Sequence, residues 1–361
     1  MARLRARAWR RGKTARPSEE PPAWAALGED EEYRELCRVR LESAVGVREP
    51  LVLISQVQRS GGTLLSQLFD GHPECHAHPQ EIYVGKPAKW DWPPLDLDAP
   101  DTWFETLHEP LVADWLRAGY VKDDTTRKKP AGTEPDVFPF VFSPRLQKAI
   151  FDACAAARRP ESERDLLDCY FTSFFNAWLD NQNLYTGPKK AVTGFTPRLA
   201  MELDRVERFF AAYPDGTLVS IVRDPRAWYA SASRHRKYYS DVEEAIGLWR
   251  QSAEAALQAA ARFGDRVVVL TYERLVEDTQ GVVESVARRI GIAWTPALLV
   301  PTFNGLPIRA NSSYGAEETG ILTGQVTAYR DVLDGDTIAR IDELSSDLYE
   351  RAAAVSEESA R

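Results

Sequence analysis

The chain has 361 residues, of which 44% are hydrophobic and 27% are charged, and its formal net charge is −9. These values are typical of a soluble globular protein, and the negative charge argues against general nucleic-acid binding. The four cysteines lie far apart with no Cys-x-x-Cys pair, so neither a zinc site nor a disulfide framework is expected, and a reducing cytoplasm fits.

The first residues, MARLRARAWRRGKTARPSEEPP, are basic but contain no apolar core, so they do not resemble a secretory signal. Binding to anionic lipid or nucleic acid is one interpretation of this segment. Its Arg, Pro and Glu content favours another, a disordered basic arm over residues 1–28. We expect residues 29–361 to form a single domain. No apolar run approaches the roughly 18–20 residues of a membrane helix, so stable membrane insertion is not expected.

The next segments alternate between regular and irregular patterns. A helix is predicted over 29–46, a strand over 51–56 and a helix over 63–70 that ends before Gly71. Residues 84–140 are rich in Pro and Trp and only weakly periodic, and a helical segment follows at about 143–183. We interpret 84–188 as a largely helical insert that forms a lid or faces a substrate. Its aromatic residues at helical spacing favour core packing: Tyr170, Phe171, Phe174, Phe175 and Trp178.

From residue 189 onward, continuous apolar strands alternate with helices. The strands are predicted at 189–195, 217–222 and 266–272, and the helices at 197–212, 225–237, 241–263 and 279–291. Such strands are typical of a parallel sheet that is covered on both faces. The sequence therefore predicts an α/β fold of three layers with a central parallel sheet.

The most informative segment is LVLISQVQRSGGTLLSQLFD, residues 51–70, in which a strand leads through the loop 58–63 into a helix. Backbone N–H groups at a helix N-terminus and the helix dipole favour an anion there. The paired glycines allow close approach of the backbone, and Arg59 adds a fixed positive charge. The loop is therefore expected to hold a phosphate or sulfate group. It lacks the Gly-Lys-Ser/Thr ending of a Walker A loop.

A second anion site is predicted at the end of another strand. In TLVSIVRDPRAWYASASRH, residues 217–235, the strand is followed by Arg223, a site where open α/β sheets place ligands. Asp224 and Pro225 form a strong helix start, and Ser231 lies about two turns into that helix. Taken alone, Arg223 would be interpreted as an ion-pair partner and Ser231 as a tolerated serine. Together with the first loop, they suggest a second phosphate contact.

The combination of strand–RSGGT–helix and strand–RDPRxWxxS resembles the sulfotransferase superfamily, whose members use 3′-phosphoadenylyl sulfate (PAPS) as sulfuryl donor and have a fold like that of P-loop NTPases. The first motif resembles the 5′-phosphosulfate loop, and the second resembles the 3′-phosphate motif. The segment LTYERLVEDTQGVVESVARRIGI, residues 270–292, is similar to a further common segment. The resemblance covers about 50–80 and 190–350. Gly62 replaces the usual first Thr of the loop, which removes one hydroxyl contact and leaves Thr63.

The resemblance implies roles for individual residues. Arg59 would stand where many relatives carry lysine, and together with the loop amides it would neutralise charge on the bridging oxygen. Arg223 and Ser231 would hold the 3′-phosphate. Tyr272 would lie near the adenine. The donor-binding set comprises Arg59, Ser60, Gly61, Gly62, Thr63, Leu64, Arg223, Ser231 and Tyr272, and residues of a C-terminal loop, Arg309, Asn311, Ser312 and Ser313.

Glu81 is the expected general base, because it lies 22 residues beyond Arg59, as the glutamate of several resembling enzymes does. His76 and His78 are the alternatives, and an ordinary ion pair is the competing interpretation for Glu81. His72, in Gly-His-Pro, is interpreted as a turn residue. For Lys189 and Lys190, a solvated charge pair is favoured over contact with the acceptor.

The sequence thus predicts a sulfotransferase that moves the sulfuryl group from PAPS to a hydroxyl, or an amine, of a small molecule or carbohydrate. This reaction requires no metal, and none is expected. A P-loop-type kinase and a nucleotide-binding protein without a catalytic base are the alternatives. The insert's tryptophans suit either an acceptor ring or a core: Trp90, Trp92, Trp103 and Trp115.

Overall fold

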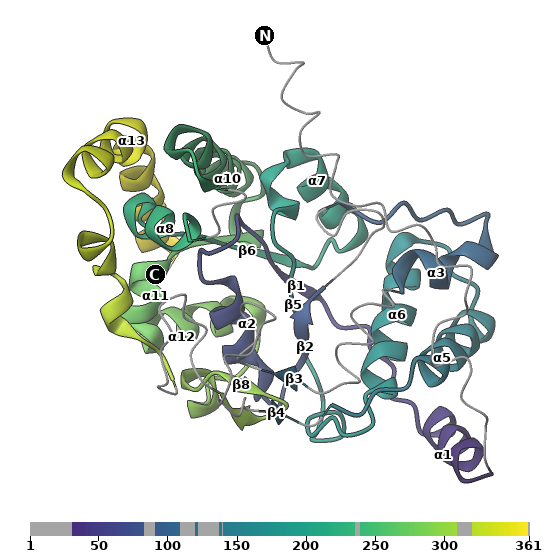
Figure 1. Ribbon diagram of the computed structural model, residues 1–361. Coiled ribbons are helices and arrows are strands. Elements are labelled where there is room, and N and C mark those ends of the chain that lie inside the picture. Colours follow the sequence, from purple (N-terminus) through teal and green to yellow (C-terminus); the bar gives the residue numbers. More distant parts are fainter. Residues whose placement is uncertain are drawn as a thin grey trace.

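The computed structural model describes residues 31–82, 91–108, 120–121, 137–138, 140–234, 239–308 and 320–359. Five strands form its central sheet in the order β2-β5-β1-β6-β7 (Figure 1). Their bounds are Cys75–Glu81 for β2, Ala191–Phe195 for β5, Leu51–Ile54 for β1, Thr217–Val222 for β6 and Val267–Thr271 for β7. All neighbouring strands pair in parallel, so their carboxyl ends lie at one edge of the sheet.

Helices cover both faces of this sheet (Figure 1). One face packs with α2 (Gly62–Asp70), α11 (Tyr272–Glu277) and α12 (Thr279–Ile290) around a core that includes Val52, Ile54 and Val219. The other packs with α6 (Glu163–Ala177), α7 (Leu203–Ala212), α10 (Val242–Phe263) and α13 (Gly335–Ser359). The strands are buried on both faces, as their continuous apolar sequences require. The predicted three-layer α/β class is therefore confirmed.

Shorter elements connect and flank these layers. The remaining helices are α1 (Glu31–Glu42), α3 (Trp103–Leu107), α5 (Pro144–Ala157) and α8 (Pro225–Ala232). The 3-10 turns are η3 (Pro100–Thr102), η4 (Leu199–Met201), η5 (Gly264–Arg266), η6 (Pro296–Leu299), η7 (Thr323–Gln325) and η8 (Ala328–Asp331). Two short antiparallel pairs join β3 (Tyr120–Val121) to β4 (Val137–Phe138) and β8 (Thr302–Phe303) to β9 (Leu306–Pro307).

The edge strand β2 was not predicted. Its sequence, CHAHPQE, contains Pro79, which lacks the N–H that a central strand would need and is tolerated at a sheet edge. The pairing of β2 with β5 also shifts register between Ala77 and Glu81. The prediction of one helical segment over 143–183 was wrong in detail as well, because the chain breaks it into α5 and α6 around Pro160.

The cysteines correct another expectation. Cys154 of α5 and Cys169 of α6 form a disulfide, with Cα atoms 5.6 Å apart, so the prediction that no cysteines pair was wrong. A spacing of 15 residues carries no recognisable disulfide pattern, and only the antiparallel packing of the two helices brings the thiols together. The cysteines therefore no longer support a reducing compartment, and the cytoplasmic location remains a prediction.

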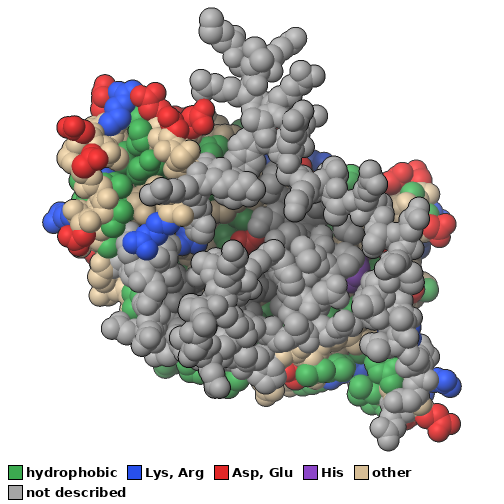
Figure 2. Space-filling view, in the orientation of Figure 1, with side chains coloured by type: hydrophobic (Ala, Val, Ile, Leu, Met, Phe, Trp, Pro, Cys, Tyr) green, Lys and Arg blue, Asp and Glu red, His purple; other side chains and the backbone are tan. Residues whose placement is uncertain are grey.

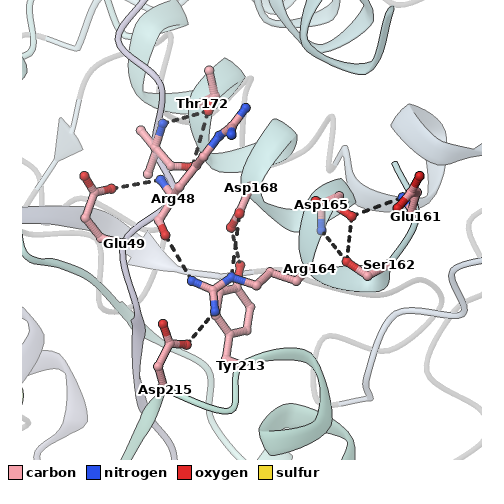
Figure 3. Close-up of polar contacts among 11 residues, drawn as sticks. Arg48, Glu49, Glu161, Ser162, Arg164, Asp165, Asp168, Thr172, Tyr213 and Asp215 are labelled. Atoms are coloured by element: carbon pink, nitrogen blue, oxygen red, sulfur yellow. Dashed lines mark hydrogen bonds and ion pairs between the residues drawn. The ribbon is translucent and has the colours of Figure 1, made fainter. Parts of the chain in front are cut away.

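Helix α6 is joined to the rest of the molecule by apolar and polar contacts. Its aromatic residues are buried, which confirms their interpretation as core. On its polar side, Arg164 donates to Asp215 Oδ1 at 2.5 Å and to the Arg48 carbonyl at 3.0 Å (Figure 3). Tyr213 donates to Asp168 Oδ1 at 3.2 Å in the same network.

Of the four tryptophans considered above for an acceptor ring, Trp92 and Trp103 lie within the described residues, and both belong to the core. Trp92 is buried and donates to Glu163 Oε2 at 2.7 Å, while Trp103 is buried and donates to the Asp96 carbonyl at 2.6 Å. Trp90 and Trp115 lie outside the described residues, as do the basic arm over 1–28 and much of the insert over 84–188. For Trp92 and Trp103, the core interpretation is therefore the correct one.

Candidate functional site: two anion-binding strand ends

The loop after β1 leads directly into the N-terminus of α2. Gly61 occupies the N-cap position with φ 103°, and no side chain caps the helix there. The first backbone N–H groups of α2 therefore face the loop without a side-chain acceptor at the N-cap, as an anion-binding helix start requires. Arg59, two residues earlier, also has a left-handed backbone, with φ 71°. The predicted contacts Ser60, Thr63 and Leu64 lie in this loop and first turn.

Buried polar atoms gather around the same loop. Both amide atoms of Gln56, Ser60 Oγ and Arg223 Nε are buried, and none has a hydrogen-bond partner among the described residues. Each unsatisfied buried group costs about 1–3 kcal/mol, so such a cluster needs an explanation. An anion with several oxygens would accept from Ser60 and Arg223. These residues therefore fit a phosphate or sulfate group.

Gly62 is required by packing as well as by the loop conformation. A Cβ atom at this position would overlap the Gln56 amide and the ring of Phe195. This crowding explains why Gly stands where the resembling loops carry Thr. The hydroxyl contact is lost because Phe195 of β5 occupies the space that a side chain would need.

Arg223 and Ser231 come from the next strand end and reach the first loop. Arg223 follows β6, and Asp224 caps α8 by accepting from the Arg226 N–H at 2.9 Å. Arg223 Nη1 donates to the Arg59 carbonyl at 3.1 Å, and Arg59 Nε donates to Ser231 Oγ at 3.3 Å. The two predicted anion sites are therefore adjacent and share Arg59.

Tyr272 lies next to residues of both predicted sites, Gly61 and Arg223. Its ring packs against Gly61, leaving no space for a Cβ there, and the Arg223 guanidinium lies 4.4 Å from the ring centre. The neighbouring Glu273 accepts from the Asp224 N–H at 3.1 Å and from the Tyr349 hydroxyl at 2.9 Å. Burial raises the pKa of Glu273. These contacts hold Tyr272 as a support for Arg223.

Glu81 ends β2 at the same edge of the sheet. Its partner in the sheet is Phe195, so β5 separates Glu81 from the β1 loop. His76 and His78 lie on the same strand but are buried, with their rings 5.0 Å from Phe175 and 4.4 Å from Phe174. Burial lowers the pKa of His76 to about 4. Both imidazoles therefore face the core helix α6.

The other residues considered in the sequence lie away from this edge of the sheet or outside the described residues. His72 Nε2 lies 2.7 Å from the Ala293 carbonyl oxygen, consistent with its interpretation as a turn residue. Lys190 pairs with Glu74 at 2.7 Å, and Lys189 donates to the Pro73 carbonyl at 2.6 Å, so Lys189 is not in a solvated pair. The C-terminal loop residues Arg309, Asn311, Ser312 and Ser313 lie outside the described residues.

Sequence reasoning missed several residues that complete the site. Gln56, Arg198 and Tyr239 contact or support the anion loop, yet none belongs to a recognised motif. A positional signal existed for Arg198, since it follows the predicted strand 189–195 closely, and ligands lie at such strand ends.

Charges of both signs occur together elsewhere on the surface. Figure 2 shows basic and acidic side chains intermixed over α10 and α13. Within the part of the chain that the structure describes, no group of three or more His, Cys, Asp or Glu residues is arranged to hold a metal ion. No helix among the described residues is long and apolar enough to cross a membrane.

Comparison with known proteins identifies the family. Residues 50–296 match the sulfotransferase family, and this segment is more than half of the 361-residue chain. The chain therefore belongs to the sulfotransferase family. A comparison with curated proteins found no match.

Solved structures of sulfotransferases are similar to this chain. The sulfotransferase domain of the Synechococcus PCC 7002 olefin synthase is similar with a TM-score of 0.50 and 18% identity, covering 83% of this chain and 96% of that domain. The sulfotransferase domain of the curacin biosynthetic pathway matches with a TM-score of 0.46 and 15% identity, over 82% and 98%. A sulfotransferase from Alicyclobacillus acidocaldarius matches with a TM-score of 0.44 and 15% identity, over 86% and 97%.

Proposed function

We propose that this sulfotransferase transfers the sulfuryl group of PAPS to a hydroxyl or an amine of a small-molecule or carbohydrate acceptor, releasing adenosine 3′,5′-bisphosphate. The observation that carries the proposal is the contact of Arg59 with Ser231, together with that of Arg223 with the Arg59 carbonyl. Two adjoining anion sites at neighbouring strand ends suit a nucleotide that carries anionic groups at two positions.

The residues divide between the two ends of the donor. The amides of α2's first turn, Ser60 Oγ and Arg59 would bind the 5′-phosphosulfate, since they converge at the helix N-terminus. Arg223 and Ser231 would bind the 3′-phosphate. The Tyr272 ring would support Arg223 through its cation–π contact with the guanidinium. Because Arg59 Nε donates to Ser231 Oγ, Arg59 would contribute to both anion sites.

The chemistry requires a base and stabilisation of the leaving group. The acceptor oxygen or nitrogen forms a bond to sulfur while the bond from sulfur to the bridging oxygen breaks, and the electron pair leaves with the bisphosphate. Arg59 and the loop amides would stabilise the charge on that oxygen. Glu81 would take the acceptor's proton, because it lies at the same sheet edge as the anion loop, with only β5 between β2 and β1.

The acceptor would enter from the β2 side of this edge. The sheet order places Glu81 at one side of the anion loop and Arg223 at the other, so the donor nucleotide and the acceptor lie on opposite sides. We propose that residues 84–188 form an acceptor-side insert within a single domain over 29–361. Trp92 and Trp103 serve its core and would not contact the acceptor.

The first test of this proposal compares two ligands. Adenosine 3′,5′-bisphosphate and ATP–magnesium are titrated into the full chain, with thermal shift and calorimetry as measurements. We expect the bisphosphate to bind and to raise Tm. Binding of ATP–magnesium with no binding of the bisphosphate would overturn the proposed donor and favour a kinase.

The second test addresses Glu81. Release of radiolabelled sulfate from PAPS, in which water takes the acceptor's place, is measured for Glu81→Gln. We expect a loss of about 10²–10⁴-fold, typical of a missing general base, with unchanged bisphosphate affinity. Glu74→Gln is the matched control, since Glu74 lies just before the opposite end of the same strand and pairs with Lys190. Full activity of Glu81→Gln would refute the assignment.

A further inference from the structure

Arg198 follows β5, the strand that separates Glu81 from the anion loop. In the sheet order β2-β5-β1-β6-β7, the strand ends present Glu81, Arg198, the anion loop, Arg223 and Tyr272 in turn. Because parallel strands end at one edge, Arg198 stands between the proposed base and the proposed donor site. A sulfuryl group that moves from donor to acceptor would pass this position.

The backbone of Arg198 is held in an unfavourable conformation. Among the described residues other than glycine, only Arg59, Arg198 and Asn304 have positive φ, and Arg198 has φ 70°. Such a conformation costs about 1–3 kcal/mol and persists where the surroundings enforce it. The Arg198 N–H donates to the Gln56 carbonyl at 2.9 Å, which ties this turn to the start of the anion loop. The loops after two neighbouring strands, β1 and β5, therefore each contain an arginine with positive φ.

The side chain of Arg198 is directed at the anion loop. Its Nε donates to Gln58 Oε1 at 2.5 Å, and its Nη2 donates to the Tyr239 hydroxyl at 3.0 Å. The Tyr239 hydroxyl also donates to Gln58 Oε1, at 3.3 Å. Gln58 Oε1 and the Tyr239 hydroxyl are both uncharged acceptors. The positive charge is thus fixed beside the residue that precedes Arg59.

The loop side of this arrangement is equally constrained. Trp228 Nε1 donates to the Gln58 carbonyl at 2.8 Å, and the Trp228 ring packs edge-on against Tyr239, with ring centres 5.6 Å apart. Gln58 is therefore held through both its backbone and its side chain. A guanidinium positioned by such a network needs little reorganisation when charge develops near it.

We propose that Arg198 binds the sulfuryl group during transfer, a role that rests on the proposed function. In that step negative charge spreads over the non-bridging oxygens of the sulfuryl group as it leaves the bridging oxygen and approaches the acceptor. Arg198 stabilises those oxygens from the acceptor side, whereas Arg59 and the loop amides act on the leaving phosphate. Gln58 and Tyr239 are positioning residues for the guanidinium.

The test separates binding of the nucleotide from binding of the sulfuryl group. Affinity is measured for adenosine 3′,5′-bisphosphate and for PAPS, and hydrolysis is followed by release of radiolabelled sulfate. For Arg198→Ala we expect unchanged bisphosphate affinity, weaker PAPS binding relative to the bisphosphate, and a rate lower by about 10²-fold, as for loss of one charge-stabilising donor. Added guanidinium at millimolar concentration should restore part of the rate.

Three further variants complete the test. Arg198→Gln serves if Arg198→Ala does not fold, because the amide can still donate to Gln58 while the charge is gone, and the same loss is expected. Tyr239→Phe should lower the rate by about 2–10-fold, in line with one neutral hydrogen bond. Arg208→Ala is the control, since Arg208 of α7 is half-exposed and pairs with Glu163 at 3.2 Å.

The outcomes distinguish this proposal from the proposed function. Suppose that the wild-type protein binds the bisphosphate and hydrolyses PAPS. If Arg198→Ala and Arg198→Gln then hydrolyse PAPS at the wild-type rate, the role of Arg198 is refuted and the proposed function stands. A wild-type protein that neither binds the bisphosphate nor hydrolyses PAPS would overturn both. Equal loss of bisphosphate and PAPS affinity in a folded Arg198→Ala variant would also contradict the proposal.

Discussion

Arg59 Nε donates to Ser231 Oγ across 3.3 Å, although the two residues are separated by 172 positions in the chain. Arg59 belongs to the loop after β1, and Ser231 belongs to α8, which follows the neighbouring strand β6. The contact connects two predicted anion sites, one in the loop after β1 and one formed by Arg223 and α8, which could have bound separate anions. A ligand at one site would therefore alter the position of a side chain in the other.

The first prediction concerns Arg223. Arg223→Ala should weaken the binding of adenosine 3′,5′-bisphosphate far more than the binding of adenosine 5′-phosphate, because the lost guanidinium would contact the 3′-phosphate. A charged hydrogen bond contributes about 1.5–3 kcal/mol, so a loss of about 10–150-fold is expected for the bisphosphate. Calorimetry with both nucleotides measures the difference. Arg289→Ala is the control, since Arg289 pairs with Asp265 at the surface. Equal losses for both nucleotides would rule out the role.

The second prediction concerns Gly62. Gly62→Ala should destabilise the protein by about 1–3 kcal/mol, because the new methyl group would overlap Phe195 and Gln56. Chemical denaturation measures the change, and adding Phe195→Leu should recover part of it. Gly247→Ala is the matched control: Gly247 lies within α10 with open space around its Cα, and alanine there should stabilise by about 0.5–1 kcal/mol. A neutral Gly62→Ala would contradict the packing argument.

The third prediction concerns the disulfide between Cys154 and Cys169. Its sequence separation of 15 residues corresponds to a stabilisation of about 3 kcal/mol through restriction of the unfolded chain. The paired change Cys154→Ala and Cys169→Ala should lower the unfolding free energy by that order, and a reductant should then have no further effect. Cys37→Ala, which removes a free cysteine, should retain the response to reductant. If reductant left the unfolding free energy of the wild-type protein unchanged, the prediction would be wrong.

The fourth prediction concerns Asp168, which lies in the network of Figure 3. Burial raises its pKa to about 6, although Arg164 and Tyr213 oppose the shift. An aspartate in the unfolded chain has a pKa of about 3.9, so the folded protein holds a proton that the unfolded chain releases. The stability from this proton is present below about pH 4 and is lost as the pH rises through about 6.

Asp168→Asn cannot titrate, so the difference in unfolding free energy between wild type and variant should fall by about 2–3 kcal/mol from pH 4 to pH 7. Denaturation at a series of pH values measures it. For Asp165→Asn, the corresponding difference in unfolding free energy should rise with pH instead of falling. Burial by itself would raise the pKa of Asp165, but hydrogen bonds from Ser162 and Glu161 lower it below its usual value. Its stability is therefore present at neutral pH and lost on acidification. A pH-independent difference for Asp168→Asn would be the failing result.

Local sequence was sufficient for much of the fold. The strand 217–222 was predicted with its observed bounds, and α10 and α12 were each predicted to within a residue at either end. Their signals are local: apolar runs for the buried strand, and caps such as Asp241 and Gly291 for the helices. The edge strand β2 lacked such a signal, because Pro79 and two buried histidines obscure its pattern.

The sequence by itself determined where the predicted anion loop and the Arg223–Ser231 pair lie, and it indicated the family, because each of these is encoded in a short stretch with fixed spacing. Only the tertiary structure decided that the two predicted anion sites adjoin through Arg59, that Phe195 crowds position 62, and that Arg198 lies between Glu81 and the loop. The physical reason is that these relationships depend on the order of strands in the sheet. A parallel sheet brings together the ends of strands that lie far apart in the chain, and no local pattern records which of them become neighbours.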